Sequence, residues 1–210
     1  MPHETDPVDR VRKNEAEMAD NFYYGRKMQL AFLVNDMDAA LKVWIDKLKV
    51  GPFVVFEKAL GSRQFVHRGE RSPIDFSLAL AYIGDTQIEL ICQNNDASSI
   101  YTEARSKGLV DGGAHHMAFW PDDMAAAHRQ LISTGFEEVA SIRSPSGEVD
   151  VYYFSSPPPL GLMVEIVPMN SARRVYFSKI KALCERSAGS QKALRFKDKD
   201  HFLASLESES

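Results

Sequence analysis

The stretch QLAFLVNDMDAA at residues 29–40 decides the fold, because HMAFWPDDMAAA at residues 116–127 repeats it. The offset is a constant 87 residues, and six of the twelve positions are identical. In each copy a short apolar run leads to an aspartate that can cap a helix, Asp36 or Asp123, and a segment of helical periodicity follows. Each copy therefore predicts a strand followed by a helix, and the chain is built from two related modules.

Runs of strand character, separated by turn residues, follow each predicted helix. They cover Phe53 to Ala59, Arg63 to His67, Asp75 to Ile83 and Thr86 to Cys92 in the first copy, and Phe136 to Arg143, Glu148 to Ser155 and Leu162 to Pro168 in the second. Each module thus consists of a strand, a helix and three or more antiparallel strands. Two such modules side by side predict an α+β fold with a concave inner face.

The rest of the chain surrounds these two modules. Turn residues, glycines and polar stretches place the boundaries between the segments. A helix from Ala97 to Lys107 is expected in the linker. We expect a polar N-terminal tail at 1–22, a first module at 23–93, a linker helix segment at 94–113, a second module at 114–169 and a helical C-terminal extension at 170–210.

Composition excludes several classes of protein. The 210 residues include 25 Lys and Arg against 29 Asp and Glu, and the net charge of −4 excludes a basic nucleic-acid clamp. No run approaches the roughly 18 consecutive apolar residues of a membrane span. The first residues lack the apolar core of a signal peptide, and the chain has two cysteines. We expect a soluble cytoplasmic protein without disulfides, and no nucleic-acid or membrane partner.

Four polar residues occupy matching places in the two copies. Side chains alternate along a strand, so Gln29 lies on the concave face, and the repeat gives His116 the equivalent place. Glu89 and Glu165 are each centred in an apolar strand, where a carboxylate is costly unless a charge compensates it. Taken singly, each residue is better explained as a solvated or hydrogen-bonded polar side chain. The duplicated placement favours a divalent-metal set of one nitrogen and three oxygens.

Which side chains line the concave face depends on the length of one turn. If Gly84-Asp85 is a two-residue hairpin turn, Leu80 lies opposite Glu89, whereas a longer turn would reverse the faces. The expected substrate-binding residues are Phe76, Leu78, Leu80 and, at the rim, Trp120. A basic stretch contains Arg63, His67, Arg68 and Arg71, and it is either an anion-binding loop or an ordinary solvated one.

These motifs together resemble those of the vicinal oxygen chelate superfamily, which includes glyoxalase I, methylmalonyl-CoA epimerase, extradiol dioxygenases and bleomycin-resistance proteins. The resemblance extends from about Lys27 to Met169 through QLAFLVNDMDAAL, VGPFVVF, QIELIC, HHMAFWPDDM and GLMVEIVP. It implies two tandem βαβββ modules that form an open barrel-like cup around a metal ion. The implied metal ligands lie at the start and on the closing strand of each module, and here they are Gln29, Glu89, His116 and Glu165.

The resemblance also implies a chemistry. Members commonly hold two substrate oxygens on a metal while a carboxylate removes the proton next to a carbonyl. We therefore expect a metal-dependent isomerase, epimerase or lyase acting on a small apolar organic substrate, with Glu165 as the preferred catalytic base and Glu89 as the alternative. The competing hypothesis is a non-catalytic small-molecule-binding protein, as in antibiotic resistance.

The cofactor and partners follow from the same resemblance. The expected cofactor is one divalent ion, either zinc, nickel, cobalt, manganese, iron or magnesium. A homodimer is also expected. His115 precedes the predicted ligand and by strand parity faces away from it.

Overall fold

The structure is a computed structural model that describes residues 24–25, 28–186 and 192–207. The predicted N-terminal tail at 1–22 lies outside the described residues. The first half of the chain contains β1 (Met28–Leu33), α2 (Met37–Lys42), the π-helix η1 (Val43–Lys47), β2 (Phe53–Phe56), β3 (Gln64–His67), β4 (Glu70–Ser72), β5 (Phe76–Ile83) and β6 (Thr86–Gln93).

The second half follows a connecting helix and again begins with a strand and a helix, but three strands follow them in place of five. It contains α3 (Ile100–Ser106), β7 (Gly113–Phe119), α4 (Met124–Ser133), β8 (Glu137–Arg143), β9 (Val149–Ser155) and β10 (Met163–Ile166). Helices α2 and α4 begin where the sequence predicts, because Asp36 and Asp123 accept hydrogen bonds from the backbone N–H groups of Ala39 and Ala126. Helix α3 begins later than predicted, at a capping box formed by Ser99.

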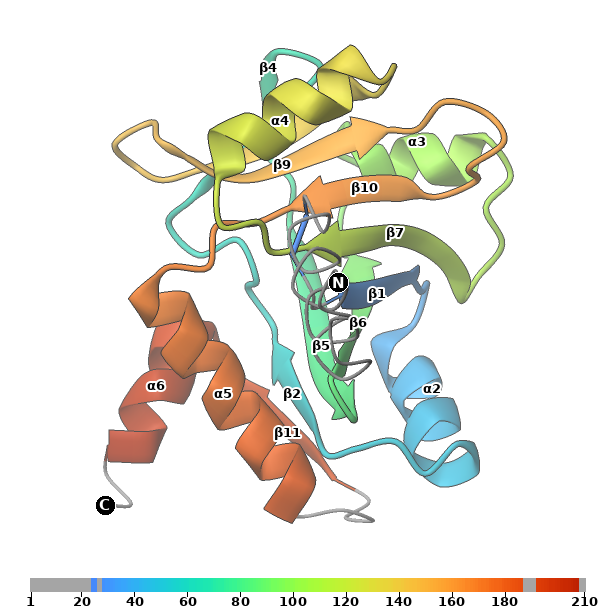
Figure 1. Cartoon of the computed structure of the whole chain (residues 1–210). Coiled ribbons are helices and arrows are strands. Elements are labelled where there is room, and N and C mark those ends of the chain that lie inside the picture. The colour runs from blue at the N-terminus through green and yellow to red at the C-terminus, as the bar shows by residue number, and fades with distance from the viewer. Residues whose placement is uncertain (1–23, 26–27, 187–191, 208–210) are drawn as a thin grey trace, which may run out of the picture.

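One sheet connects both halves of the chain. Its strand order is β11-β2-β5-β6-β1-β7-β10-β9-β8-β3-β4. Within each half the opening strand runs parallel to the closing strand, β1 with β6 and β7 with β10. The halves join where β1 and β7 pair antiparallel, so a single chain forms the whole cup (Figure 1). The predicted α+β fold with two tandem modules is confirmed.

The hairpin of β3 and β4 leaves the half in which its sequence lies. Strand β3 pairs antiparallel with β8, so residues 64–72 extend the edge of the second half. Phe65 is buried there, and its ring contacts Tyr101 and Tyr153, each with a centroid distance of 6.3 Å. The sequence predicted this strand but not its crossing, because no turn signal records which half Phe65 packs against.

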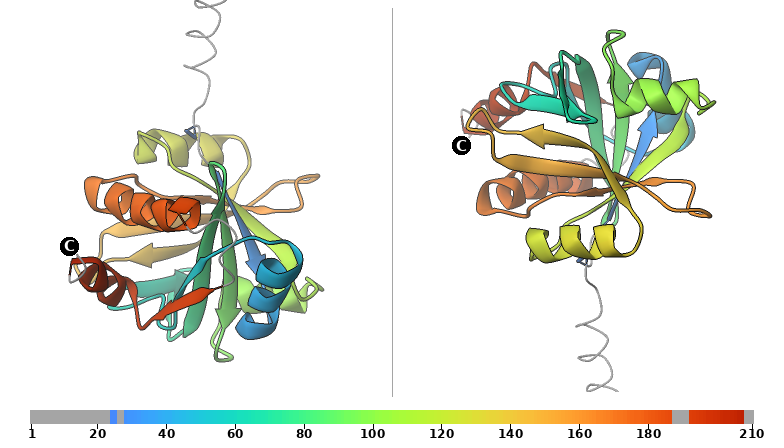
Figure 2. Two further views of the ribbon diagram at one scale, coloured as in Figure 1. Left: turned by 90° about the horizontal axis from the view of Figure 1, so that it is seen from below. Right: turned by 90° about the horizontal axis from the view of Figure 1, so that it is seen from above.

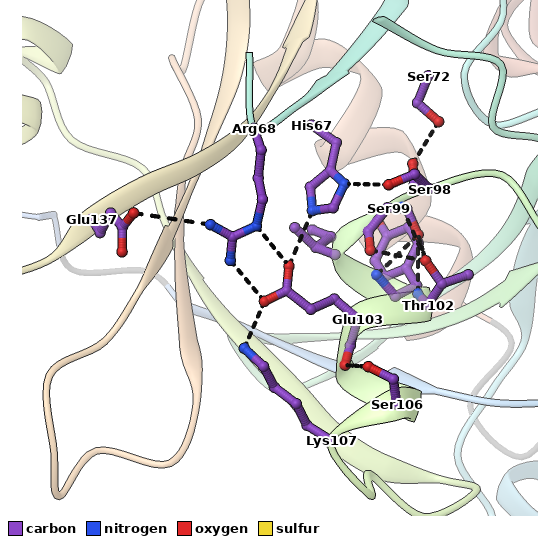
Figure 3. Close-up of polar contacts among 12 residues, drawn as sticks. His67, Arg68, Ser72, Ser98, Ser99, Thr102, Glu103, Ser106, Lys107 and Glu137 are labelled. Atoms are coloured by element: carbon purple, nitrogen blue, oxygen red, sulfur yellow. Dashed lines mark hydrogen bonds and ion pairs between the residues drawn. The ribbon is translucent and has the colours of Figure 1, made fainter. Parts of the chain in front are cut away.

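A polar network fixes the crossing hairpin to α3 (Figure 3). Glu103 of α3 accepts hydrogen bonds from Arg68 Nη2 at 2.7 Å and from Lys107 Nζ at 2.6 Å, and its Oε2 lies 3.2 Å from His67 Nε2. The arginine and lysine bonds lower the pKa of Glu103 to about 2. His67 and Arg68 of the basic stretch are therefore partners of an acid within the chain.

This network predicts a pH-dependent stability. A carboxyl whose folded pKa lies below its unfolded value stabilises the fold fully above the unfolded pKa, and this stabilisation is lost as the pH falls toward the folded pKa. We expect the free energy of unfolding to fall between about pH 5 and pH 2, and Glu103→Gln to flatten that part of the curve. Urea unfolding at a series of pH values measures this, with Glu148→Gln, at an exposed position, as the control. An unchanged slope in Glu103→Gln would contradict the assignment.

The C-terminal extension contains α5 (Ser171–Arg186), β11 (Ala193–Phe196) and α6 (Lys199–Glu207). The two helices were expected, but β11, which pairs parallel with β2, was not. Helix α5 buries Tyr176, Ile180 and Cys184, and Phe202 of α6 is fully buried. Both helices therefore pack against the sheet of their own chain (Figure 2).

Across the described ranges, no helix combines the length and apolar character needed to span a membrane.

Candidate metal centre and substrate cavity

Three of the four predicted ligands meet at the centre of the cup. Glu89 comes from β6, His116 from β7 and Glu165 from β10, and all three are buried. His116 Nε2 lies 3.0 Å from Glu165 Oε2 and 3.4 Å from Glu89 Oε2. One ligand atom from each residue lies within 4.8 Å of the others. The strand pairing causes this convergence, because β1 and β7 bring the closing strands β6 and β10 to either side of the junction.

The His116 ring nitrogen tests whether a metal ion suits this group. His116 Nε2 is fully buried and has no hydrogen-bond partner of normal geometry, although two carboxylate oxygens lie close to it. A buried polar atom without a partner costs on the order of 1–3 kcal/mol. A divalent cation bound between the nitrogen and the two carboxylates would satisfy all three groups at once. The residues therefore fit a metal ion.

The electrostatics of the group support the same conclusion. Burial raises the pKa of Glu89, although His116 opposes this. Burial alone would lower the pKa of His116, but the carboxylates of Glu165 and Glu89 outweigh it and raise this pKa to about 9. Two acids and one imidazole in an apolar interior thus attract positive charge.

His115 does not face away from this centre, so the prediction from strand parity was wrong. The pairing of β1 with β7 shifts between Ala31, opposite His116, and Phe32, opposite Ala114. His115 is thus the extra residue of a β-bulge, and a bulge interrupts the alternation of side chains. As a result, His115 Nδ1 lies 3.0 Å from His116 Nδ1.

This contact fixes the tautomer of His116. His115 Nε2 lies 3.4 Å from the carbonyl oxygen of Ile100, which can only accept, so His115 carries its proton on Nε2. Burial lowers the pKa of His115 to about 3, so its ring is neutral and its Nδ1 accepts. His116 must therefore donate from Nδ1. The raised pKa of His116 favours a second proton on Nε2, between the carboxylates, and loss of that proton leaves an Nε2 lone pair that can bind a metal ion.

Gln29, the fourth predicted ligand, has a protein partner in the structure. Its Nε2 donates to Gln87 Oε1 at 2.6 Å, and Gln87 Nε2 in turn donates to the hydroxyl of Tyr82 at 2.8 Å. Gln29 lines the same cavity as Glu89 and Glu165. Its role as a metal ligand stays a prediction.

A cavity of about 170 Å³ lies next to this centre. Of the two turn lengths left open by the sequence, the structure has the two-residue Gly84-Asp85 turn, because Ile83 pairs with Thr86, and Leu80 therefore lies opposite Glu89. All four predicted substrate-binding residues line the cavity: Phe76, Leu78, Leu80 and Trp120. Their contact with a substrate stays a prediction. The volume is below the roughly 300–1,000 Å³ of sites for drug-sized ligands, so the cavity fits only a small molecule or one end of a larger one.

Several lining residues were not predicted from the sequence. Tyr101 and Tyr153 contribute buried hydroxyls, and Asp150, Arg173 and Phe177 complete the wall. Phe177 of α5 packs on Trp120 with a centroid distance of 5.3 Å, so the extension forms part of the cup. The repeat carried no signal for Arg173 and Phe177, because α5 lies outside it.

Arg63 was part of the predicted basic stretch, but its environment is different from the rest of that stretch. It lines the cavity and pairs with Asp150 at 2.9 Å, whereas His67 and Arg68 contact Glu103. One member of the stretch thus belongs to the candidate site.

Comparison with solved structures finds similar folds at low sequence identity. A hypothetical protein from Bacillus halodurans has a TM-score of 0.50 and 16% identity, and the match covers 70% of this chain and 95% of that one. Methylmalonyl-CoA epimerase from Mycobacterium tuberculosis has a TM-score of 0.49 and 19% identity, with 73% and 95% covered. A variant of Streptomyces coelicolor methylmalonyl-CoA epimerase in complex with 2-nitronate-propionyl-CoA has a TM-score of 0.48 and 18% identity, with 70% and 96% covered.

No protein of curated function matches the sequence significantly. The model of the glyoxalase/bleomycin resistance protein/dioxygenase superfamily matches residues 28–153, which include the first half of the cup and most of the second. That match agrees with the paired βαβββ arrangement and with the family resemblance of the sequence motifs. The chain belongs to the glyoxalase/bleomycin resistance protein/dioxygenase superfamily.

Proposed function

We propose that this protein is a metal-dependent isomerase, epimerase or lyase that removes a proton next to a carbonyl group of a small substrate. Glu89, His116 and Glu165 would hold one divalent ion, and Gln29 is the candidate fourth ligand. The observation that carries the proposal is the buried His116 Nε2, which has no hydrogen-bond partner and faces two carboxylates.

The residues of the chain have distinct parts in this chemistry. A divalent ion supplies positive charge that lowers the cost of negative charge on a substrate carbonyl oxygen. Glu165 is the preferred base for the adjacent proton, and Glu89 is the alternative, since both line the cavity. The apolar side chains of Phe76 and Leu80 hold the substrate and exclude water. His115 orients His116 by accepting its Nδ1 proton.

Elemental analysis of protein purified without a chelator tests the proposal. We expect about one divalent metal ion per chain, since the described residues provide one such group. The loaded protein should then catalyse exchange of deuterium from the solvent next to a carbonyl group, measured by proton NMR on a panel of small carbonyl acids. Absence of binding after incubation with each of the six expected metals would overturn the proposal and favour a ligand-binding cup without turnover.

A second expectation concerns His115. His115→Phe keeps a ring but removes the acceptor for His116 Nδ1, so we expect metal affinity to fall about 10- to 100-fold. Titration calorimetry measures the affinity, and nitrogen-15 NMR of the metal-free protein, at a pH well above the His116 pKa of about 9 where the ring is neutral, reads the tautomer of His116. His128→Phe removes a histidine that pairs instead with Glu138, and should leave both readings unchanged. Unaltered affinity and tautomer in His115→Phe would refute the orienting role.

A homodimer and a cytoplasmic location stay predictions. Apolar side chains of the C-terminal extension, Ile180, Cys184 and Phe202, are buried within their own chain. Light scattering during size-exclusion chromatography measures the oligomeric state.

A further inference from the structure

The cavity is lined by charges of both signs. Glu89 and Glu165 share its wall with Arg63, Asp150 and Arg173. The positive charge of Arg63 acts to lower the pKa of Glu89. The residues Arg63, Asp150 and Arg173 come from different regions of the chain. Arg63 follows β2, Asp150 belongs to β9 and Arg173 belongs to the first turn of α5.

The two arginines share one acid. Asp150 Oδ2 accepts from Arg63 Nη1 at 2.9 Å, and Asp150 Oδ1 accepts from Arg173 Nη2 at 2.8 Å. Two guanidinium groups and one carboxylate leave a net charge of +1. This charge is partly buried, since the side chains of Arg63, Asp150 and Arg173 are 31%, 24% and 14% exposed. The exposed Lys199 adds a further cation to the cavity lining.

The arginines also keep donors to spare. Arg63 uses one N–H for Asp150 and two for the carbonyl oxygens of Leu60 and Ala59. Arg173 uses one for Asp150 and one for the carbonyl of Pro168. A guanidinium has five N–H donors, so within the described part of the chain these bonds occupy three on Arg63 and two on Arg173. The carbonyl bonds hold both groups in place, which reduces the entropy lost when they bind a ligand.

We propose that Arg63 and Arg173 form a subsite for a carboxylate group of the substrate, with Asp150 holding the two guanidiniums together. The role of this subsite in catalysis rests on the proposed function, and the subsite makes the substrate of that reaction a small organic acid. Attraction to the arginines would fix the carboxylate beside them, in the same cavity that Glu89 and Glu165 line.

The alternative is a purely structural role, here called the clamp. In the clamp, the arginines serve only to attach α5 to β9 through Asp150, and no ligand binds. The two ideas differ in whether the cavity distinguishes a carboxylate from a neutral amide of the same shape.

Binding of butanoate and of butanamide to chelator-treated protein tests the proposal without any metal. The readout is the side-chain Nε–Hε NMR signals of Arg63 and Arg173. We expect butanoate to shift these signals saturably and butanamide to leave them unchanged. Equal shifts from both compounds would overturn the subsite, and this comparison in the unaltered protein does not depend on any variant folding. Because no metal is present, failure of the proposed metal chemistry would not imitate this result.

Variants sharpen the test. Arg173→Gln should weaken butanoate binding about tenfold, the effect of one lost charge-assisted hydrogen bond. Arg174→Gln is the matched control one position along α5, at an exposed residue outside the cavity lining. Unchanged affinity in Arg173→Gln would favour the clamp.

Discussion

Replacing His116 with glutamine is expected to abolish stoichiometric metal binding. His116 provides the only nitrogen among the three grouped ligands, and it is the one whose buried atom has no other partner. Loss of a residue that merely supports a ligand costs about 10- to 100-fold in affinity, so loss of the ligand itself should exceed about 100-fold. Metal content by mass spectrometry and affinity by calorimetry measure the change.

The same substitution at another histidine provides the control. His128 lies on α4, partly exposed, and pairs with Glu138 at 2.8 Å. His128→Gln should keep one metal ion per chain. Retention of metal by His116→Gln would show that the carboxylates bind it without the imidazole, and the proposed centre would then be wrong.

Much of the fold was predictable because it is recorded twice. The strand and helix occur twice, so the same pattern can be examined in two copies. A polar residue at the same place in both copies is less easily explained by chance than a polar residue in one copy. This is why His116, Glu89 and Glu165 could be placed together from the sequence. The hairpin turn at Gly84-Asp85 then fixed the register, and with it the side of the sheet to which Leu80 points.

The features missed by the sequence analysis are those that break the repeat. A β-bulge moves one residue out of alternation, and nothing around His115 marks it in advance. The crossing of β3 depends on which half of the fold buries Phe65, and this is decided by tertiary packing and not by the local sequence. Arg173 and Phe177 lie in an extension that has no counterpart in the repeat, so their contact with the cavity could be seen only in three dimensions.

Substituting Glu165 with glutamine is expected to separate proton removal from metal binding. Glutamine keeps the shape and one oxygen ligand but is not a base, so the exchange rate should fall about 10²- to 10⁴-fold if Glu165 removes the proton. Glu89→Gln tests the alternative base, since each carboxylate lies within 3.4 Å of the same ring nitrogen of His116. Deuterium exchange in metal-loaded protein measures both variants.

Metal content must be measured in each variant, because either glutamate can also act as a ligand. A large loss of exchange with metal retained identifies the base, whereas a parallel loss of metal and exchange identifies a ligand. Glu138→Gln, at a partly exposed acid outside the cavity, should change neither quantity. If both Glu165→Gln and Glu89→Gln keep full exchange with metal bound, neither carboxylate removes the proton. The reaction would then need a different base in the cavity wall. Tyr153 lies there but is a poor base, because burial raises its pKa and so disfavours the ionised form.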